Sequence, residues 1–340
     1  METLSQVGEF GLIHRIRDLL QKEGCAASGV TLGIGDDAAS FLPRSGHEIL
    51  ITCDSMVEGR HYLPARISPR DLGRRAMVSN ISDIGAMGGL PLYALISLGL
   101  RGDQPVEELE ALYRGFLDEL NPFGASIIGG NLTSAGEKVF IDITLLGEVQ
   151  RGKALRRSNA RVGDSILVTG YPGRSAAGLR LLLREGDLSD LRNHPLVRAY
   201  NLPSHRARAG RAAALSGRVT AMIDTSDGFL GDLGHICEES RVGAVLRQEN
   251  LPLHRDVEEA ARKLGVDPYS LLLGESDDYE LILTCDPHDV NLLREVVEDT
   301  FEGPLTDVGT IAPPDEGIRL IRRDGQIQDL KGAGFDHFAS

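Results

Sequence analysis

Aspartates recur in short clusters, most of them beside glycines or at the ends of predicted strands. Ligands gather at strand ends in α/β folds, so aspartates placed there are expected to face a common site. The clusters contain no histidine pair and no C-x-x-C, and they therefore favour Mg²⁺, which usually combines one or two carboxylates with substrate phosphates. The clusters are GIGDD (33–37), TCD (52–54), NISD (80–83), DTSDG (224–228) and the pair Asp277 and Asp278.

Any one of these aspartates has an alternative interpretation as a helix cap or a turn former. Asp83 fits that alternative poorly, because aspartate is disfavoured inside a predicted helix unless something uses it. Asn80 lies three residues before Asp83, so the two side chains share one helix face. The recurrence of such clusters along the chain favours metal binding over capping.

Two glycine patterns resemble phosphate-binding loops, but each lacks a residue that its motif requires. GEVQRGKA (147–154) fits G-x-x-x-x-G-K, but Ala154 stands where the Mg²⁺-binding Ser or Thr is needed, and no helical apolar pattern follows. Gly33 and Gly35 lack the third glycine of a dinucleotide fingerprint. The sequence therefore predicts neither a Walker A loop nor a Rossmann site.

Charge and composition exclude several classes of partner. The chain has 36 lysines and arginines against 50 aspartates and glutamates, a net charge of −14, which disfavours nucleic acid and anionic membranes as partners. Its four cysteines are far apart, so neither a disulfide framework nor a zinc site is predicted. The first residues lack the apolar core of a signal peptide and no apolar run approaches a membrane span, so we expect a soluble, cytoplasmic protein.

Strands and helices alternate up to about residue 148, and five basic residues within 151–161 precede a second alternating series. This break predicts two domains, residues 1–150 and 151–340. An N-terminal helix is marked by an apolar face with Leu12, Ile16 and Leu19. Further helices are predicted near 68–88, 105–120, 173–184, 206–215, 228–240, 256–264 and 289–299. Strands are predicted near 48–53, 93–100, 125–130, 139–147, 165–170, 219–223, 280–285 and 318–322.

Several motifs together resemble one enzyme family. The N-terminal half carries GEFGLI, GIGDDA, TCDSMVEGRHYLP and VSNISDIGAMGG, and the C-terminal half carries IDTSDGFLGDLGHI, DDYEL and the closing GFDHF. In this order they resemble the thiamine-monophosphate kinases, from Gly8 to Phe338. GIGDD alone is shared across the wider aminoimidazole-ribonucleotide-synthetase superfamily, whereas EGRHYLP combined with GFDHF is much more specific to the kinase.

The resemblance implies an α+β N-terminal domain that dimerises through its sheet and an α/β C-terminal domain, both of the aminoimidazole-ribonucleotide-synthetase (AIR-synthase) type. It implies ATP as co-substrate, several Mg²⁺ ions per site, thiamine monophosphate as acceptor and a homodimer. The reaction implied is direct in-line transfer of the γ-phosphoryl group, giving thiamine pyrophosphate.

The resemblance also assigns site residues, position by position. The implied metal ligands are Asp36, Thr52, Cys53, Asp54, Asp83, Asn131, Asp224 and Asp227, of which Asp54, Asp83 and Asp224 are also the implied catalytic residues. The implied ATP contacts are Tyr113, Gly130, Asn131, Arg157 and Ser226. The implied contacts with the thiamine phosphate are His61, Asp277 and Phe335.

Three positions depart from the family pattern. Cys53 stands where Thr is usual, Asn131 replaces an Asp, and Asp277 replaces a Glu one methylene longer. Cys is a poor Mg²⁺ ligand except through its backbone carbonyl, and Asn keeps an oxygen but loses a charge. These departures leave two alternatives open: another ATP-using enzyme of the superfamily, such as an amidine-forming ligase or a selenophosphate synthetase, or a non-catalytic nucleotide-binding homologue.

Overall fold

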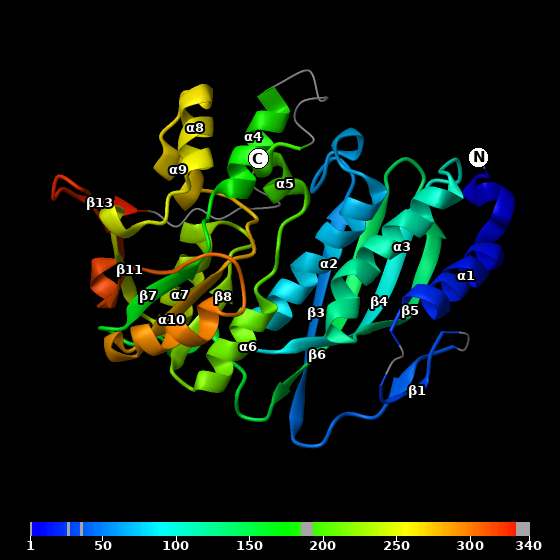
Figure 1. Ribbon diagram of the computed structural model, residues 1–340, viewed down its shortest axis with the longest axis horizontal. Helices are drawn as coiled ribbons and strands as arrows, with labels where there is room; N and C mark the ends of the chain where they lie inside the picture. Colours follow the sequence, from blue (N-terminus) through cyan, green and yellow to red (C-terminus); the bar gives the residue numbers. More distant parts are fainter. Residues whose placement is uncertain (1, 26–27, 35–36, 185–192, 331–340) are drawn as a thin grey trace. The chain divides into compact units, whose positions relative to one another are not determined.

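The computed structural model describes residues 2–25, 28–34, 37–184 and 193–330. The chain divides into two compact units (Figure 1). The N-terminal unit comprises Met1–Ile84 and Gly89–Arg151, and the C-terminal unit comprises Gly85–Gly88 and Gly152–Ser340. Each unit has its own sheet.

The N-terminal unit contains a four-stranded mixed sheet in the order β3-β6-β4-β5. β6 pairs antiparallel with both β3 and β4, and β4 pairs parallel with β5. A separate two-stranded ribbon, β1 with β2, lies outside this sheet. The strands are β1 (Val30–Leu32), β2 (Ser40–Phe41), β3 (His47–Val57), β4 (Leu90–Leu100), β5 (Ser126–Ser134) and β6 (Phe140–Gln150).

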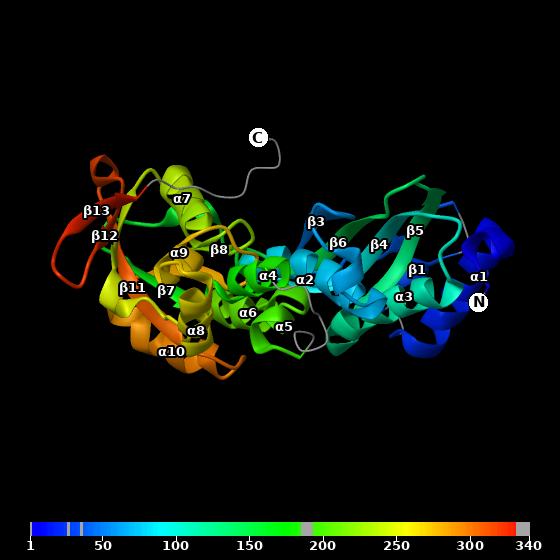
Figure 2. The same ribbon diagram turned by 90° about the horizontal axis from the view of Figure 1, so that it is seen from above.

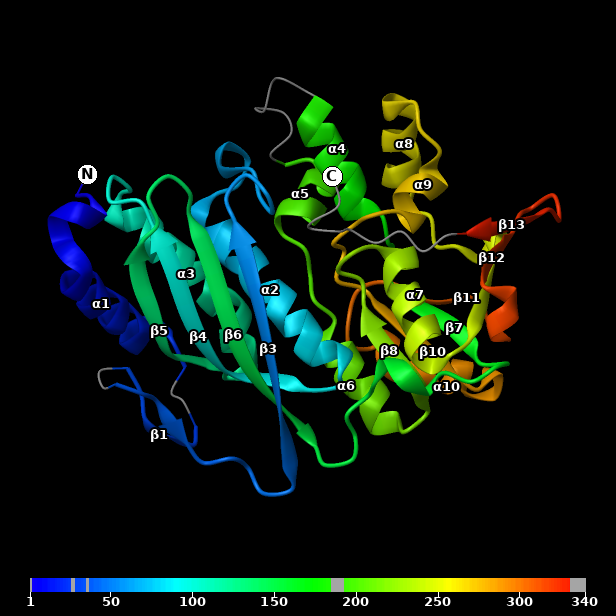
Figure 3. The same ribbon diagram turned by 180° about the vertical axis from the view of Figure 1, so that it is seen from behind.

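Helices cover one face of this sheet and leave the other face open (Figures 2 and 3). The covering helices α2 and α3 approach each other so closely that a Cβ on Gly115 would lie 2.0 Å from the carbonyl oxygen of Arg70. On the open side, Ile51 is 68% exposed, whereas Ile96 and Ile143 on the covered side are fully buried. The helices of this unit are α1 (Leu4–Glu23), α2 (Pro69–Ala86) and α3 (Val106–Leu120).

The C-terminal unit contains a seven-stranded sheet in the order β13-β12-β9-β11-β7-β10-β8. Only β9 and β12 pair in parallel among these strands, so the sheet is mixed and mostly antiparallel, not the parallel sheet that an α/β domain implies. The strands are β7 (Ser165–Thr169), β8 (Val219–Asp224), β9 (Gly243–Arg247), β10 (Leu281–Cys285), β11 (Leu305–Ala312), β12 (Ile318–Ile321) and β13 (Ile327–Leu330).

Both faces of this sheet are covered. Ile166 and Ile223 pack in one core with α7, while Leu167 and Met222, the alternate residues of the same strands, pack in a second core with α6 and α10. This alternation explains why β7 is buried along its whole length. The helices on the two faces are α6 (Ala207–Ser216), α7 (Phe229–Ser240) and α10 (Val290–Glu298).

A smaller helical cluster stands beside this sheet (Figure 1). Its apolar contacts join Leu181, Leu196, Val257 and Leu271. The helices are α4 (Arg174–Arg184), α5 (Pro195–Asn201), α8 (Arg255–Leu264) and α9 (Pro268–Leu273). Short 3₁₀ turns complete the chain: η1 (Pro64–Arg66), η2 (Asn121–Phe123), η3 (Arg157–Asn159), η4 (Gln248–Asn250), η5 (Pro287–Asp289) and η6 (Pro314–Glu316).

The predicted long helices are present within two residues of their expected ends, because apolar periodicity and capping residues mark them well. The prediction omitted α5, α9, β1, β2, β9, β11 and β13, none of which is longer than eight residues. Within the described ranges, no helix combines the length and the apolarity needed to cross a bilayer.

Candidate active site

In the N-terminal unit, β3 and α2 bring Thr52 and Asp83 into contact. The Thr52 hydroxyl donates a hydrogen bond to the Asp83 carboxylate. Asp54 lies two residues beyond Thr52 on the same strand, so its side chain points to the same face of the sheet. The structure therefore joins two of the predicted metal ligands directly and places a third on their face.

The side chain of Cys53 lies on the other face of the sheet. Its thiol is 3.6 Å from an Asp142 carboxylate oxygen, and the hydroxyl of Thr144 lies 3.6 Å from the same sulfur. The two-residue period of a strand requires this separation from Thr52 and Asp54. A contribution of Cys53 to the metal site would have to come from its backbone, and it stays a prediction.

Asn131 also lies on the open face. It is paired with Ser97, which is paired in turn with Asp142, and residues paired in this way point to the same side. Asp142 accepts a hydrogen bond from Ser55, a neighbour of Cys53 on that face. The structure does not bring the Asn131 side chain to Thr52 and Asp83, so its metal and ATP roles stay predictions that rest on the resemblance.

Two predicted ATP contacts have structural explanations in the N-terminal unit. A Cβ on Gly130 would lie 2.0 Å from the carbonyl oxygen of Ile96, so the pairing of β5 with β4 already requires glycine there. Tyr113 is 4% exposed, and its ring packs edge-on against Phe116 with 5.4 Å between centroids. Burial raises the pKa of the Tyr113 hydroxyl. ATP contacts by these residues stay predictions.

His61 is held in one protonation pattern by its own loop. The backbone N–H of Val57 donates to Nδ1 of His61 at 3.0 Å, so Nδ1 is an acceptor and the neutral ring carries its proton on Nε2. Glu58 braces this loop, accepting from Arg101 at 2.7 Å and from the N–H of Val139 at 3.1 Å. His61 is thereby arranged to present an N–H donor, which suits an anionic phosphate.

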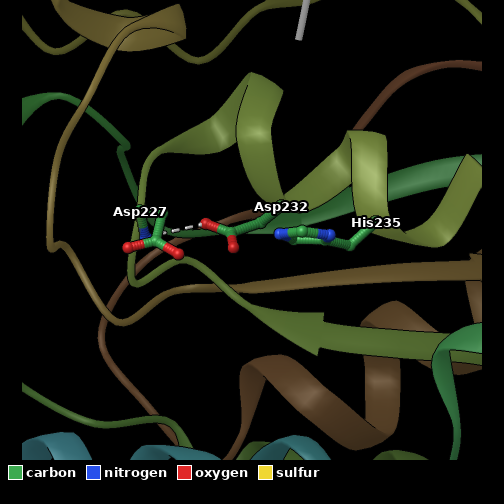
Figure 4. A group of neighbouring side chains, drawn as sticks. All are labelled: Asp227, Asp232 and His235. Carbon is green, nitrogen blue, oxygen red and sulfur yellow. Dashed lines mark hydrogen bonds between the residues drawn. The ribbon is translucent and has the colours of Figure 1, made fainter. Parts of the chain in front are cut away.

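In the C-terminal unit, β8 ends at the buried Asp224 and the chain turns into α7 through DTSDG. Asp232, one turn into α7, accepts from the backbone N–H groups of Ser226, Asp227 and Gly228, each at 3.1 Å (Figure 4). These bonds hold the loop that carries Asp227. Gly228 is required where it stands, because a Cβ there would lie 2.2 Å from the carbonyl oxygen of Gly274.

Asp227, Asp232 and His235 form a compact group that the sequence did not indicate (Figure 4). Ligand atoms of all three lie within 4.8 Å of one another. Burial, and next the charge of Asp227, raise the pKa of Asp232 to about 7. The spacing D-x-x-x-x-D-x-x-H is the only trace that the sequence holds of this group.

Thr225 joins this loop to the predicted substrate loop. Its N–H donates to the carbonyl of Glu280 at 2.8 Å, its carbonyl accepts from the N–H of Tyr279 at 2.9 Å, and its hydroxyl accepts from the N–H of Glu280 at 3.0 Å. Tyr279 has a φ of 53°, a strained value for a residue with a side chain. Asp277, which accepts from the Ser175 hydroxyl, is therefore held two residues from a segment bonded to Thr225.

The structure gives less information on the four remaining predicted site residues. Ser226 is exposed on the DTSDG loop. Arg157 is exposed, and its carbonyl accepts from Ser240 at 2.7 Å, which anchors it at the end of α7 opposite to Asp227. Asp36 and Phe335 lie outside the described residues. The roles of all four residues stay predictions.

Asp278, next to Asp277, makes the stability of this unit sensitive to pH. Burial raises the pKa of Asp278 to about 6, against a normal value of about 3.9 in an unfolded chain. Between these values the folded protein keeps a proton that the unfolded chain has lost, so stability falls as pH rises from about 4 to about 6 and levels off above.

We expect the melting temperature of the parent protein, minus that of Asp278→Asn, to decrease as pH rises from 4.5 to 6.5. The amide of the variant cannot titrate, so the difference isolates Asp278 from other carboxylates. Calorimetric melts at three pH values check this. A difference that is constant or increases with pH would contradict the assignment.

The chain matches two family models. The AIR synthase related protein N-terminal domain matches residues 35–149, and the AIR synthase related protein C-terminal domain matches residues 161–320. Together the two matches span most of both units.

The chain is similar over nearly its full length to curated and solved proteins. It is 36% identical to the thiamine-monophosphate kinase of Escherichia coli K12, covering 98% of this chain and 99% of that protein. The crystal structure of thiamine-monophosphate kinase from Stenotrophomonas maltophilia K279a superposes with a TM-score of 0.78 at 31% identity, covering 94% and 97% of the two chains. A structure described as AaThiL complexed with AMPPCP and TMP gives a TM-score of 0.72 at 29% identity, covering 99% of each chain.

Proposed function

The chain belongs to the AIR synthase-related family and, within it, to the thiamine-monophosphate kinases, and from this premise we propose that it phosphorylates thiamine monophosphate with ATP. The products are thiamine pyrophosphate and ADP. The full-length similarity carries this conclusion over the alternatives of another superfamily enzyme or a non-catalytic homologue. The structure described as complexed with AMPPCP and TMP supports the same pair of ligands.

The acceptor in this reaction already has its nucleophile. The second pKa of a phosphate monoester is about 6, so at pH 7 the attacking oxygen is mostly ionised. No general base is needed, and the described parts of both units offer hydrogen-bond donors and carboxylates instead. The barrier to be lowered is the repulsion between an anionic acceptor and a polyanionic donor.

The carboxylates of the two units fit Mg²⁺. Thr52, Asp54 and Asp83 in the N-terminal unit and Asp224 and Asp227 in the C-terminal unit offer hard oxygen atoms, which Mg²⁺ prefers over nitrogen or sulfur. Bound Mg²⁺ supplies positive charge against the phosphates. We assign these five residues to holding it, with Asp54, Asp83 and Asp224 closest to the chemistry.

Three further side chains complete the proposed site. His61 donates its Nε2 proton to the acceptor phosphate, since Val57 occupies Nδ1. Asp277 contacts the substrate from a loop that Ser175 and Thr225 hold in place. Arg157 offers a planar guanidinium to phosphate oxygens.

We also propose a homodimer that forms through the open face of the N-terminal sheet. Ile51 and Leu95 expose 68% and 36% of their surface there, which is unusual for large apolar residues of a sheet. Ile51→Asp should convert the dimer to a monomer in light-scattering measurements. A parent protein that is monomeric at micromolar concentration would exclude this assembly.

The acceptor preference tests the proposed function. Thiamine monophosphate should be phosphorylated at least about 100-fold faster than free thiamine, because thiamine offers a neutral hydroxyl and general-base activation is typically worth 10²-fold or more. The assay compares thiamine monophosphate, thiamine and an aminoimidazole precursor side by side with ATP and Mg²⁺. Comparable rates with free thiamine would overturn the assignment, and turnover of only the aminoimidazole precursor would favour the alternative enzyme.

A further inference from the structure

A cavity of about 510 Å³ opens in the C-terminal unit beside the first turn of α4. This volume is typical of sites for small organic molecules. Three arginines and three acidic residues share its wall: Arg174, Arg198, Arg206, Asp278, Glu280 and Glu302.

One arginine of the wall is fully engaged by an acid. Arg206 binds Glu280 through two parallel hydrogen bonds of 2.6 Å each, and Thr169 donates to the same carboxylate at 2.6 Å. The guanidinium also lies 5.0 Å from the ring centroid of Phe301. Arg206 and Glu280 therefore neutralise each other and form a rigid part of the wall.

Asp278 is also engaged. Its carboxylate accepts from the backbone N–H groups of Gly173 at 2.5 Å and Ser175 at 2.8 Å, and from the hydroxyl of Ser276 at 2.6 Å. These donors stabilise its charge and fix the backbone on both sides of Arg174.

The other two arginines are not engaged. The Nε atom of Arg174 is shielded from the solvent in the cavity and has no hydrogen-bond partner among the described residues, so a ligand would have to contact the terminal nitrogens of this side chain. No ion pair joins Arg198 to any residue of the described ranges, and its side chain is exposed at the mouth. The remaining acid, Glu302, is exposed, as Arg198 is, so water screens the charges of both side chains. The cavity therefore presents two available guanidinium groups.

We propose that this cavity is a second ligand site of the chain, which takes an organic molecule that carries a diphosphate group. A guanidinium binds two oxygens of a phosphate at once, so two of them suit two linked phosphates. Tyr171, held edge-on by His254 with 4.8 Å between ring centroids, provides an aromatic wall for the organic part. ADP and thiamine pyrophosphate both have this chemistry.

The test is calorimetric titration in metal-free buffer with EDTA, using inorganic pyrophosphate, ADP and thiamine pyrophosphate. All three should bind to the parent protein, and the organic ligands should bind more tightly than pyrophosphate. The tighter binder of ADP and thiamine pyrophosphate is taken as the ligand of this cavity. Arg174→Gln and Arg198→Gln should each weaken binding roughly tenfold, the loss of one charged hydrogen-bonding group.

A control variant localises the effect. Arg180→Gln removes the same charge from α4 but from outside the cavity, so it should bind within about twofold of the parent. Arg198 is exposed, so its variant is expected to fold even if the Arg174 variant does not. Absence of saturable pyrophosphate binding, unchanged affinity in Arg198→Gln, or organic ligands no tighter than pyrophosphate would each overturn the proposal. The titration needs no turnover, so its failure leaves the kinase activity untouched.

Discussion

Asp83→Asn is expected to lower kcat for thiamine monophosphate about 100-fold or more, with the fold intact. Asparagine still offers an oxygen to the Thr52 hydroxyl, so the contact between β3 and α2 is kept. The change removes one negative charge from the residues that we propose hold Mg²⁺. Steady-state kinetics at saturating ATP and Mg²⁺, with a thermal melt of each variant, check this.

The matched control for that variant is Asp103→Asn. The Asp103 side chain is 84% exposed in the same unit, and it should retain parental kcat. If Asp83→Asn kept more than about a tenth of parental kcat at saturating Mg²⁺, a charge at position 83 would not serve transition-state stabilisation, and the metal assignment in this unit would be wrong.

Asp227→Asn is expected to lower kcat by a similar factor, about 100-fold, and to raise the Mg²⁺ concentration needed for half-maximal rate. The loop should keep its shape, because Asp232 receives its hydrogen bond from the backbone of Asp227 and not from the side chain. A titration of initial rate against Mg²⁺ separates the loss of affinity from the loss of rate.

The variant Asp232→Asn tests whether Asp232 positions the loop that carries Asp227 or acts on the reaction directly. Asp232 accepts three backbone N–H groups through one oxygen, so its replacement should lower the melting temperature as well as the rate. Asp315→Asn, an exposed change in the same unit, serves as the control. Equal stability of the Asp227 and Asp232 variants, with equal loss of rate, would show that the two carboxylates do not differ in role.

The sequence indicated the site residues that lie in motifs, and missed those that act through the backbone. Asp224 and Asp227 stand in a recognisable DTSDG turn, so their placement at the end of β8 followed from the strand-to-helix pattern. Asp232 and Thr225 bind backbone groups of loops that are remote or irregular, and no periodicity marks such partners. Only the folded structure brings these partners together.

The faces on which strand residues lie were also predictable only in part. The two-residue period alone separates the Cys53 side chain from Thr52 and Asp54, so this feature was available from the sequence. The placement of Asn131 was not, because it depends on the register of β5 with β4 and of β4 with β6. Register is set by long-range pairing and cannot be derived from one strand.

The long helices were predictable because particular residues mark their ends. α2 begins at Pro69, a residue favoured in the first helical turn, and α8 is followed by Gly265 with a φ of 70°, a conformation that glycine adopts freely. The strand β11 contributes Leu305 to one core and Val308 to the other, so it lacks a simple alternating pattern, and β9 is only five residues long. Their place in the sheet is decided by tertiary packing.

We expect this chain to transfer the terminal phosphoryl group of ATP to thiamine monophosphate. The most direct measurement incubates the purified protein with thiamine monophosphate, Mg²⁺ and ATP labelled with ¹⁸O in its γ-phosphoryl group, and analyses the products by mass spectrometry. The expected products are ADP and thiamine pyrophosphate in equal amounts, with the label in the terminal phosphate of thiamine pyrophosphate. Label released only as inorganic phosphate, or no thiamine pyrophosphate at all, would contradict it.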